Sequence, residues 1–156
     1  GLGTPIYSMY MTGLLKSFTE RLLPLATPHI RRNADGTFYH DGRIKRFPRV
    51  FCVANCGFPG EHNFDLLKAM VVRMSPVLEI YRNCGEVLGD IGEADTPAIS
   101  EFYDALRQAG REMVAGGPVS EETVRRIHAE LISDEEYMAG ANRHWDEEIR
   151  RAESQG

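Results

Sequence analysis

The chain has 156 residues, of which 42% are hydrophobic and 26% charged, and its formal net charge is −5. A chain of this size and composition suits one folded domain. Its acidic balance, without a basic aromatic surface, argues against nucleic acid as a partner. We find neither ~18 uninterrupted apolar residues, as a membrane helix needs, nor a signal segment, so we expect a cytoplasmic protein without a membrane partner.

The first 25 residues predict a short extended stretch followed by a helix. Apolar residues recur near helical spacing at Met11, Leu14, Leu15, Phe18 and Leu22. The hydroxyl of Thr12 can cap a helix that begins near Gly13, and Pro24 ends it. The strand that should precede such a helix is nearly missing, so we expect residues 4–12 to form a loop of a βα unit.

Residues 25–60 predict a hairpin and then a buried strand. Two Asp-Gly pairs between short β-prone stretches favour a hairpin insertion over residues 25–48. Its basic residues, with Arg49, could meet a phosphate or an acidic partner, although a solvated hairpin is the simpler interpretation. The run "RVFCVAN", which ends at "NCGFPG", is typical of a strand buried on both faces.

Residues 63–117 continue the alternation of helix and strand. A helix from Asn63 to Ser75 is expected to place Phe64, Leu67 and Val71 on one face. The run "VLEIYRN" indicates another strand, and Thr96-Pro97 caps the next helix. This alternation predicts a parallel sheet with helices on both faces.

Residues 118–156 predict a C-terminal helical extension. Ser120 caps one helix, and the capping box Ser133-x-x-Glu136 opens another. Tyr137, Ala141, Trp145 and Ile149 lie on one stripe of the last helix. We expect this stripe to pack against the domain or against a second subunit.

Two loops at the carboxyl ends of the predicted strands suit a flat heteroaromatic ligand. The loop over residues 4–12 offers Tyr7, Met9 and Met11, which can lie against an apolar ring. The loop over residues 55–62 offers backbone N–H groups, an aromatic ring at Phe58, and Gly57, which can adopt a positive φ. For Tyr7 or Phe58 taken singly, packing in the core explains the residue equally well.

Cysteine and histidine give weaker signals. The three cysteines, Cys52, Cys56 and Cys84, fit neither a disulfide framework nor a metal pattern, so we expect reduced thiols. Cys56 as a nucleophile would need a nearby base, and His62 lies six residues on. No two histidines stand at i, i+4 spacing, so we expect no metal site.

The segment "TPIYSMYMTGLLKSFTERLLPL" resembles the flavodoxin-like, NADPH-dependent FMN reductases, relatives of iron–sulfur flavoproteins and quinone reductases. "VANCGFPGEHNFDLL" is similar to the next strand and flavin loop of that family. The resemblance implies an FMN-dependent oxidoreductase that passes electrons from NAD(P)H to a small acceptor such as a quinone. The implied cofactor-binding residues are Thr4, Pro5, Ile6, Tyr7, Ser8, Met11, Thr12, Asn55, Cys56, Gly57 and Phe58. No side chain is implied as a catalytic acid or base.

The resemblance also sets the expected domain organisation. Residues 1–117 would form the C-terminal portion of a flavodoxin-like three-layer sandwich whose N-terminal strands, with the phosphate-binding loop, are missing from this chain. The chain is expected to form a homo-oligomer. The alternative is a non-catalytic, incomplete flavodoxin-like module that acts through protein association, using its basic hairpin and acidic C-terminal helices.

Overall fold

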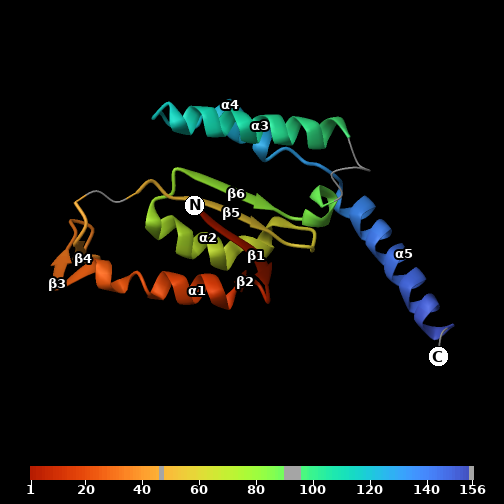
Figure 1. The fold of residues 1–156 in the computed structure, drawn as a ribbon, viewed down its shortest axis with the longest axis horizontal. Coiled ribbons are helices and arrows are strands. Elements are labelled where there is room, and N and C mark those ends of the chain that lie inside the picture. The colour runs from red at the N-terminus through yellow and green to blue at the C-terminus, as the bar shows by residue number, and fades with distance from the viewer. Residues whose placement is uncertain (46–47, 90–95, 155–156) are drawn as a thin grey trace.

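Strands and helices alternate around one small sheet (Figure 1). The computed structural model describes residues 1–45, 48–89 and 96–154. The strands are β1 (Leu2–Tyr7), β2 (Tyr10–Met11), β3 (Ala26–Arg32), β4 (Phe38–Gly42), β5 (Phe51–Asn55) and β6 (Leu78–Arg82). The α-helices are α1 (Gly13–Glu20), α2 (Asp65–Val71), α3 (Pro97–Val114), α4 (Glu121–Ile127) and α5 (Asp134–Glu153). The prediction of a mixed α/β fold is confirmed.

The main sheet has the strand order β2-β1-β5-β6, in which β1, β5 and β6 are parallel. Pro5 lies opposite Asn55, and Asn55 lies opposite Arg82, so the three parallel strands end at one edge. The mostly parallel sheet was predicted correctly, whereas the finer flavodoxin-like assignment stays a prediction. The prediction that the first strand is nearly missing was wrong, because β1 has six residues and pairs with β5 along Leu2–Pro5.

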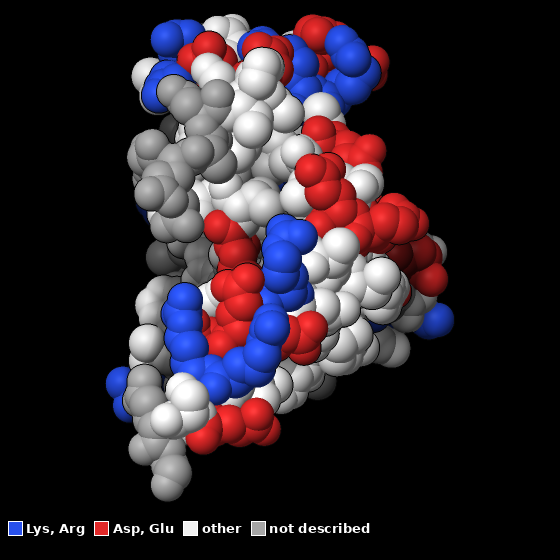
Figure 2. Space-filling view, turned by 90° about the vertical axis from the view of Figure 1, so that its right-hand side faces the viewer, with Lys and Arg blue, Asp and Glu red and all other residues white. Residues whose placement is uncertain are grey.

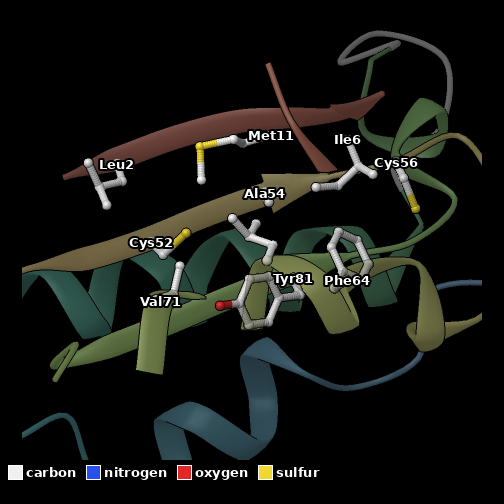
Figure 3. Packing of buried hydrophobic residues seen from close by; sticks show 10 residues of the cluster. Leu2, Ile6, Met11, Cys52, Ala54, Cys56, Phe64, Val71 and Tyr81 are labelled. Atoms are coloured by element: carbon white, nitrogen blue, oxygen red, sulfur yellow. The ribbon is translucent and has the colours of Figure 1, made fainter. Parts of the chain in front are cut away.

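Each face of the sheet carries its own apolar cluster. On one face, Phe64, Leu67 and Val71 from α2 and the turn before it pack against β1, β5 and Tyr81 (Figure 3). On the other face, α3 and α4 pack against Leu78 and Ile80 of β6. Figure 1 shows α1 and α2 on one side of the sheet and α3 and α4 on the other. The core is therefore divided by the sheet, as an α/β fold requires.

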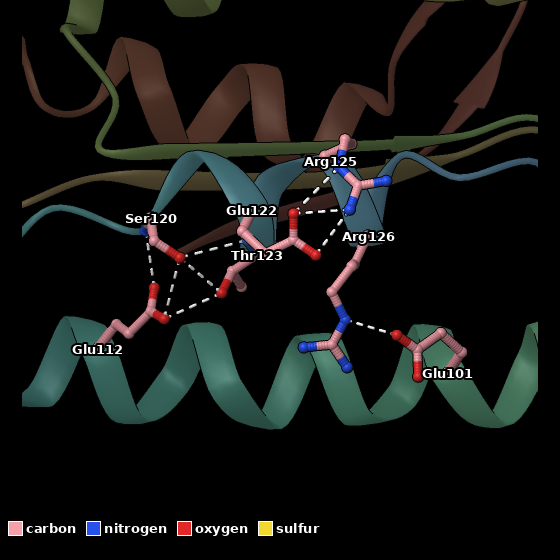
Figure 4. A network of polar contacts seen from close by, with 7 residues as sticks. All are labelled: Glu101, Glu112, Ser120, Glu122, Thr123, Arg125 and Arg126. Carbon is pink, nitrogen blue, oxygen red and sulfur yellow. Dashed lines mark hydrogen bonds and ion pairs between the residues drawn. The ribbon is translucent and has the colours of Figure 1, made fainter.

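A polar network fastens α4 to α3 (Figure 4). The carboxylate of Glu112 on α3 accepts hydrogen bonds from the Ser120 N–H at 2.7 Å and from the Thr123 hydroxyl at 2.9 Å. Arg126 of α4 forms an ion pair with Glu101 of α3 at 2.5 Å. Of the predicted C-terminal extension, α4 is thus packed on the body of the domain, and α5 alone departs from it in Figure 1.

One face of β5 is left open. Val53 is 38% exposed, although β5 lies between β1 and β6. The prediction of a strand buried on both faces was therefore wrong. The physical reason is that α3 and α4 pack on β6 and on Phe51 at the start of β5, and a cavity lies between α3 and Val53. Parallel strands are normally covered on both faces.

Four helices begin at the predicted caps. The side-chain oxygen of each cap accepts a hydrogen bond from the backbone N–H three residues later, which satisfies a donor that the helix leaves free. These caps are Thr12, Thr96, Ser120 and Ser133. The helix starts were therefore predictable from local sequence.

Two apolar helix stripes remain exposed. On α1, Leu14 is 85% exposed and Phe18 is 52% exposed. On α5, Tyr137 is the one buried residue, and Trp145 is 62% exposed. The expected packing of the α5 stripe against the domain therefore holds for its first turn only. Neither stripe has a partner among the described residues that buries it.

The predicted hairpin is confirmed as a separate two-stranded sheet of β3 and β4. Its basic side chains are partly engaged within it. Arg31 forms an ion pair with Asp41 at 2.9 Å, and the Arg43 Nε donates to the Ala26 carbonyl. Arg46 of the same basic run lies outside the described residues.

Candidate functional site

The two loops that were expected to hold a ligand follow neighbouring strands. Because β1 and β5 are parallel with Pro5 opposite Asn55, both loops leave the sheet at its carboxyl edge. The Cys56 N–H donates to the Arg82 carbonyl at 3.0 Å, which continues the β5–β6 pairing beyond the strand. Tyr7 and Cys56 therefore lie on the same rim of the molecule.

The first loop is a tight hairpin and not the nine-residue loop that was predicted. Tyr7 pairs with Tyr10, so Ser8 and Met9 form a two-residue turn between β1 and β2. Both have positive φ, 50° and 67°, as the right-handed twist of a hairpin favours. Non-glycine residues adopt this conformation only where surrounding structure compensates its cost. In this turn, 68% of the surface of Tyr7 and 44% of the surface of Met9 are exposed to solvent.

Three predicted ligand residues of the first loop have buried side chains. Thr4, Ile6 and Met11 point into the protein, the last two within the core cluster (Figure 3). The Thr4 hydroxyl accepts a hydrogen bond from the Thr12 N–H at 3.1 Å, which ties the start of α1 to β1. A ligand at the rim could meet these residues through their backbone alone. Their side chains instead hold the hairpin in place.

Hydrogen bonds to its backbone fix the second loop. The Cys56 carbonyl accepts from the Gly85 N–H at 2.8 Å. The side-chain amide of Asn63 donates to the carbonyls of Pro59 and Gly60, at 2.8 and 2.7 Å. The loop after β5 is therefore rigid, and Phe58 stands out from it with 74% of its surface exposed.

Cys56 lacks the environment of a nucleophile. Its side chain is 6% exposed, and its thiol donates to the Phe58 carbonyl at 3.3 Å. Burial raises the pKa of the Cys56 thiol, and the hydrogen bond to that carbonyl only partly opposes the shift. The group is therefore held as a thiol at neutral pH. All three cysteines are free and buried, in agreement with the prediction of reduced thiols.

The role expected of Gly57 belongs to Gly60. Gly57 has no positive φ, whereas Gly60 has φ of 88° and takes the chain into the turn before α2. A Cβ built at Gly57 would lie 3.4 Å from the Glu86 carboxylate, which is an ordinary van der Waals contact. The prediction of a left-handed Gly57 was therefore wrong.

A cavity of about 440 Å³ lies between the second loop and α5. Its walls include Gly57, Phe58, Glu86, Tyr137, Met138 and Trp145. The Tyr137 hydroxyl donates to Glu86 at 3.1 Å, which joins α5 to the turn Gly85–Leu88 after β6. Burial, together with this hydrogen bond, raises the pKa of Tyr137, so the phenol stays a neutral donor.

Sequence reasoning did not identify this cavity. It singled out Tyr137 and Trp145 as a stripe, but only as a packing surface, and it gave Glu86 no role. The signal that could have indicated it was the presence of two aromatic residues, Tyr137 and Trp145, on one stripe of a helix that is otherwise rich in charged residues. The partner loop lies about eighty residues away in sequence, as the numbering of Phe58 and Tyr137 shows. Only the fold brings the two together.

A second cavity of about 440 Å³ lies on the open sheet face, lined by Gly3, Pro5, Val53, Phe102 and Leu106 among others. Arg82 also reaches it, and its side chain is 7% exposed. One guanidinium nitrogen donates to the Ile127 and Ala129 carbonyls at 3.1 Å each, whereas the buried Nε has no partner among the described residues. Burial lowers the pKa of Arg82.

The side of the molecule on which α5 lies carries charges of both signs (Figure 2). Within residues 1–45, 48–89 and 96–154, no three His, Cys, Asp or Glu side chains are grouped so as to hold a metal ion. None of the helices in this part of the chain has the length and apolar character needed to cross a membrane.

No protein-family model matches the chain, and neither curated proteins nor solved structures include a significant match to it.

Proposed function

We propose that the chain provides the ring-binding site of an FMN-dependent NAD(P)H oxidoreductase, at the rim formed by Tyr7 and residues 55–58. The observation that carries the proposal is the meeting of two loops, predicted to bind one ligand, at a single edge of the parallel sheet. Ligands of open α/β sheets bind at this edge. When bound, FMN would supply the redox chemistry between a nicotinamide and a small acceptor such as a quinone.

The groups at the rim suit a flat ring with polar edges. Tyr7 and Phe58 offer exposed aromatic faces for stacking. The N–H groups of Gly57 and Phe58 donate to no protein acceptor among the described residues, so they are free to bind the polar edge of a ligand. Fixed N–H donors stabilise negative charge that develops on such an edge. The chain's own residues would bind and orient the ring, and no side chain is needed as an acid or base.

The described rim would bind the ring of FMN but not its phosphate. The described rim has no glycine-rich loop at a helix N-terminus that would cradle a phosphate. Riboflavin, which has the ring without the phosphate, should therefore bind about as well as FMN. This expectation separates the ring site from a complete flavin site.

The test is a titration of FMN and riboflavin with protein, followed by flavin fluorescence. Replacing Phe58 by alanine should weaken binding of both flavins about tenfold, since an aromatic stacking contact is worth roughly 1.4 kcal/mol. Phe38→Ala is the matched control, because Phe38 is similarly exposed, at 69%, but lies on the hairpin. Absence of binding, or equal losses in both variants, would contradict the proposal.

A second candidate function is association with another protein chain, without catalysis. Three observations on different surfaces of the domain favour it. Among the described residues, the edge of β1 is paired with β2 at Ile6 and Tyr7 only, Val53 is exposed on the open face, and Leu14 and Phe18 are exposed on α1. Unpaired strand edges and uncovered apolar faces are the surfaces on which chains associate.

If the chain functions by association, the first partner to test is a second copy of the same chain. Sedimentation velocity should then give a mass above the 17.5 kDa of one chain. Val53→Lys should shift the protein to the monomer, whereas Val114→Lys, at an 89% exposed position of α3, should not. A wild-type protein that sediments as a monomer would rule out self-association.

A further inference from the structure

The cavity between the second loop and α5 has aromatic and apolar walls that are left exposed. Phe58 is 74% exposed, Trp145 62% and Met138 53%, and all three line this one space. Trp145 has the edge of the His144 ring as its aromatic neighbour, at 5.5 Å between ring centroids. Large apolar side chains gathered around one opening mark a binding surface more often than isolated exposed residues do. The volume, about 440 Å³, lies in the range of small-molecule sites.

The same cavity has one charged wall, and the charge is negative. Glu86 is the single charged residue among those that line it. The Tyr137 hydroxyl donates to one carboxylate oxygen of Glu86 at 3.1 Å, and the other oxygen lies beside Gly57. Glu86 forms no ion pair with a Lys or Arg among the described residues. A positioned carboxylate without a cation thus faces an aromatic cavity.

We propose that this cavity binds a small planar organic cation. Such a ligand would place its ring against Trp145 and Phe58 and its positive charge near Glu86. The faces of Trp and Phe attract cations through the ring quadrupole, and a nearby carboxylate adds to that attraction. A neutral ring would gain the stacking alone, and an anion would be repelled. The cavity shares Gly57 and Phe58 with the proposed flavin rim, but its other walls include Glu86 and residues of α5. The inference goes beyond the flavin proposal and does not depend on it, because it requires neither Tyr7 nor a bound flavin.

The test is calorimetric titration of the full chain, free of flavin, with 1-methylquinolinium and, separately, with quinoline in its neutral form. These probes have nearly the same shape and differ in charge. We expect saturable binding of the cation, about fivefold tighter than that of quinoline. Trp145 is the one tryptophan of the chain, so quenching of its fluorescence by the cation should saturate at the same concentrations.

Two variants locate the two parts of the interaction. Glu86→Gln should reduce the preference for the cation to the part that the Trp145 and Phe58 faces supply, and should leave the binding of quinoline unchanged. Trp145→Ala should weaken both probes, and its exposed position leaves the fold intact, which circular dichroism checks. Phe38→Ala again serves as the exposed-aromatic control. Equal affinity for the two probes, non-saturable quenching, or a preference that is as large in Glu86→Gln as in the wild-type protein would each overturn the proposal.

Discussion

Replacement of Thr123 by valine tests how strongly the polar network fastens α4 to α3. Thr123 is 2% exposed. Its hydroxyl donates to Glu112 at 2.9 Å and accepts from the Ser120 hydroxyl at 2.9 Å (Figure 4). Valine keeps the shape and the β-branch, so the substitution removes two hydrogen bonds without creating a cavity. At about 1 kcal/mol each, the free energy of unfolding should fall by about 2 kcal/mol.

The assay is urea unfolding at neutral pH, followed by circular dichroism. For a chain of this size, the loss corresponds to a fall in Tm of about 6 °C. Thr123→Ser is the matched variant, because it keeps the hydroxyl and loses one methyl group, worth about 0.8 kcal/mol. Valine should therefore be the more damaging replacement. If serine costs more, then packing of the methyl group, and not the network, holds α4 in place.

The pH dependence of the same variant gives a second check. The Ser120 N–H, followed by the side chain of Gln108, lowers the pKa of Glu112 from 4.5 to about 2. Because this pKa is lower in the folded state, the stabilisation is present above pH 4.5 and is lost as the pH falls towards 2. The cost of Thr123→Val should shrink over this interval, since a protonated Glu112 is a weaker acceptor. A cost that does not change with pH would refute the reasoning.

Three further predictions concern the core and the second loop. Leu67→Ala, at a fully buried position, should lower the free energy of unfolding by about 2–5 kcal/mol, whereas Leu66→Ala, at a 58% exposed position, should change it by less than about 0.5 kcal/mol in the same urea assay. Gly60→Ala should destabilise, because φ is 88° and the new Cβ would lie 2.7 Å from the His62 ring; Gly110→Ala, with open space in α3, should stabilise by roughly 0.5–1 kcal/mol. Cys56 should react with Ellman's reagent only as fast as the protein opens, so rapid labelling of the native protein would contradict the burial of its thiol.

The candidate rim shows how far sequence reasoning reached. It predicted that the ends of two parallel strands bring Tyr7 and Asn55 to one edge, and the register of β1 and β5 bears this out. It did not predict that Ile6 and Met11 point into the core, because that depends on the register of the short β1–β2 hairpin. A shift of one residue in a strand would exchange the faces of all its side chains.

Burial was the least predictable property. The β-branched and aromatic run of β5 favoured a strand covered on both faces, yet Val53 is exposed. The helix stripe with Leu14 and Phe18 likewise indicated a packing face that the described chain leaves open. A pattern of apolar residues shows that a surface is suited to burial, but not which element buries it.

The sequence by itself determined the order of helices and strands after residue 12 and the helix starts at Thr12, Thr96, Ser120 and Ser133. These properties depend on residues within one or two turns of each other, where propensity and capping decide. Only the tertiary structure decided that Glu86 and Tyr137 meet beside Phe58, and that one face of β5 stays open. Such contacts join segments far apart in the chain, and their geometry is fixed by sheet register and helix packing, which no local pattern specifies.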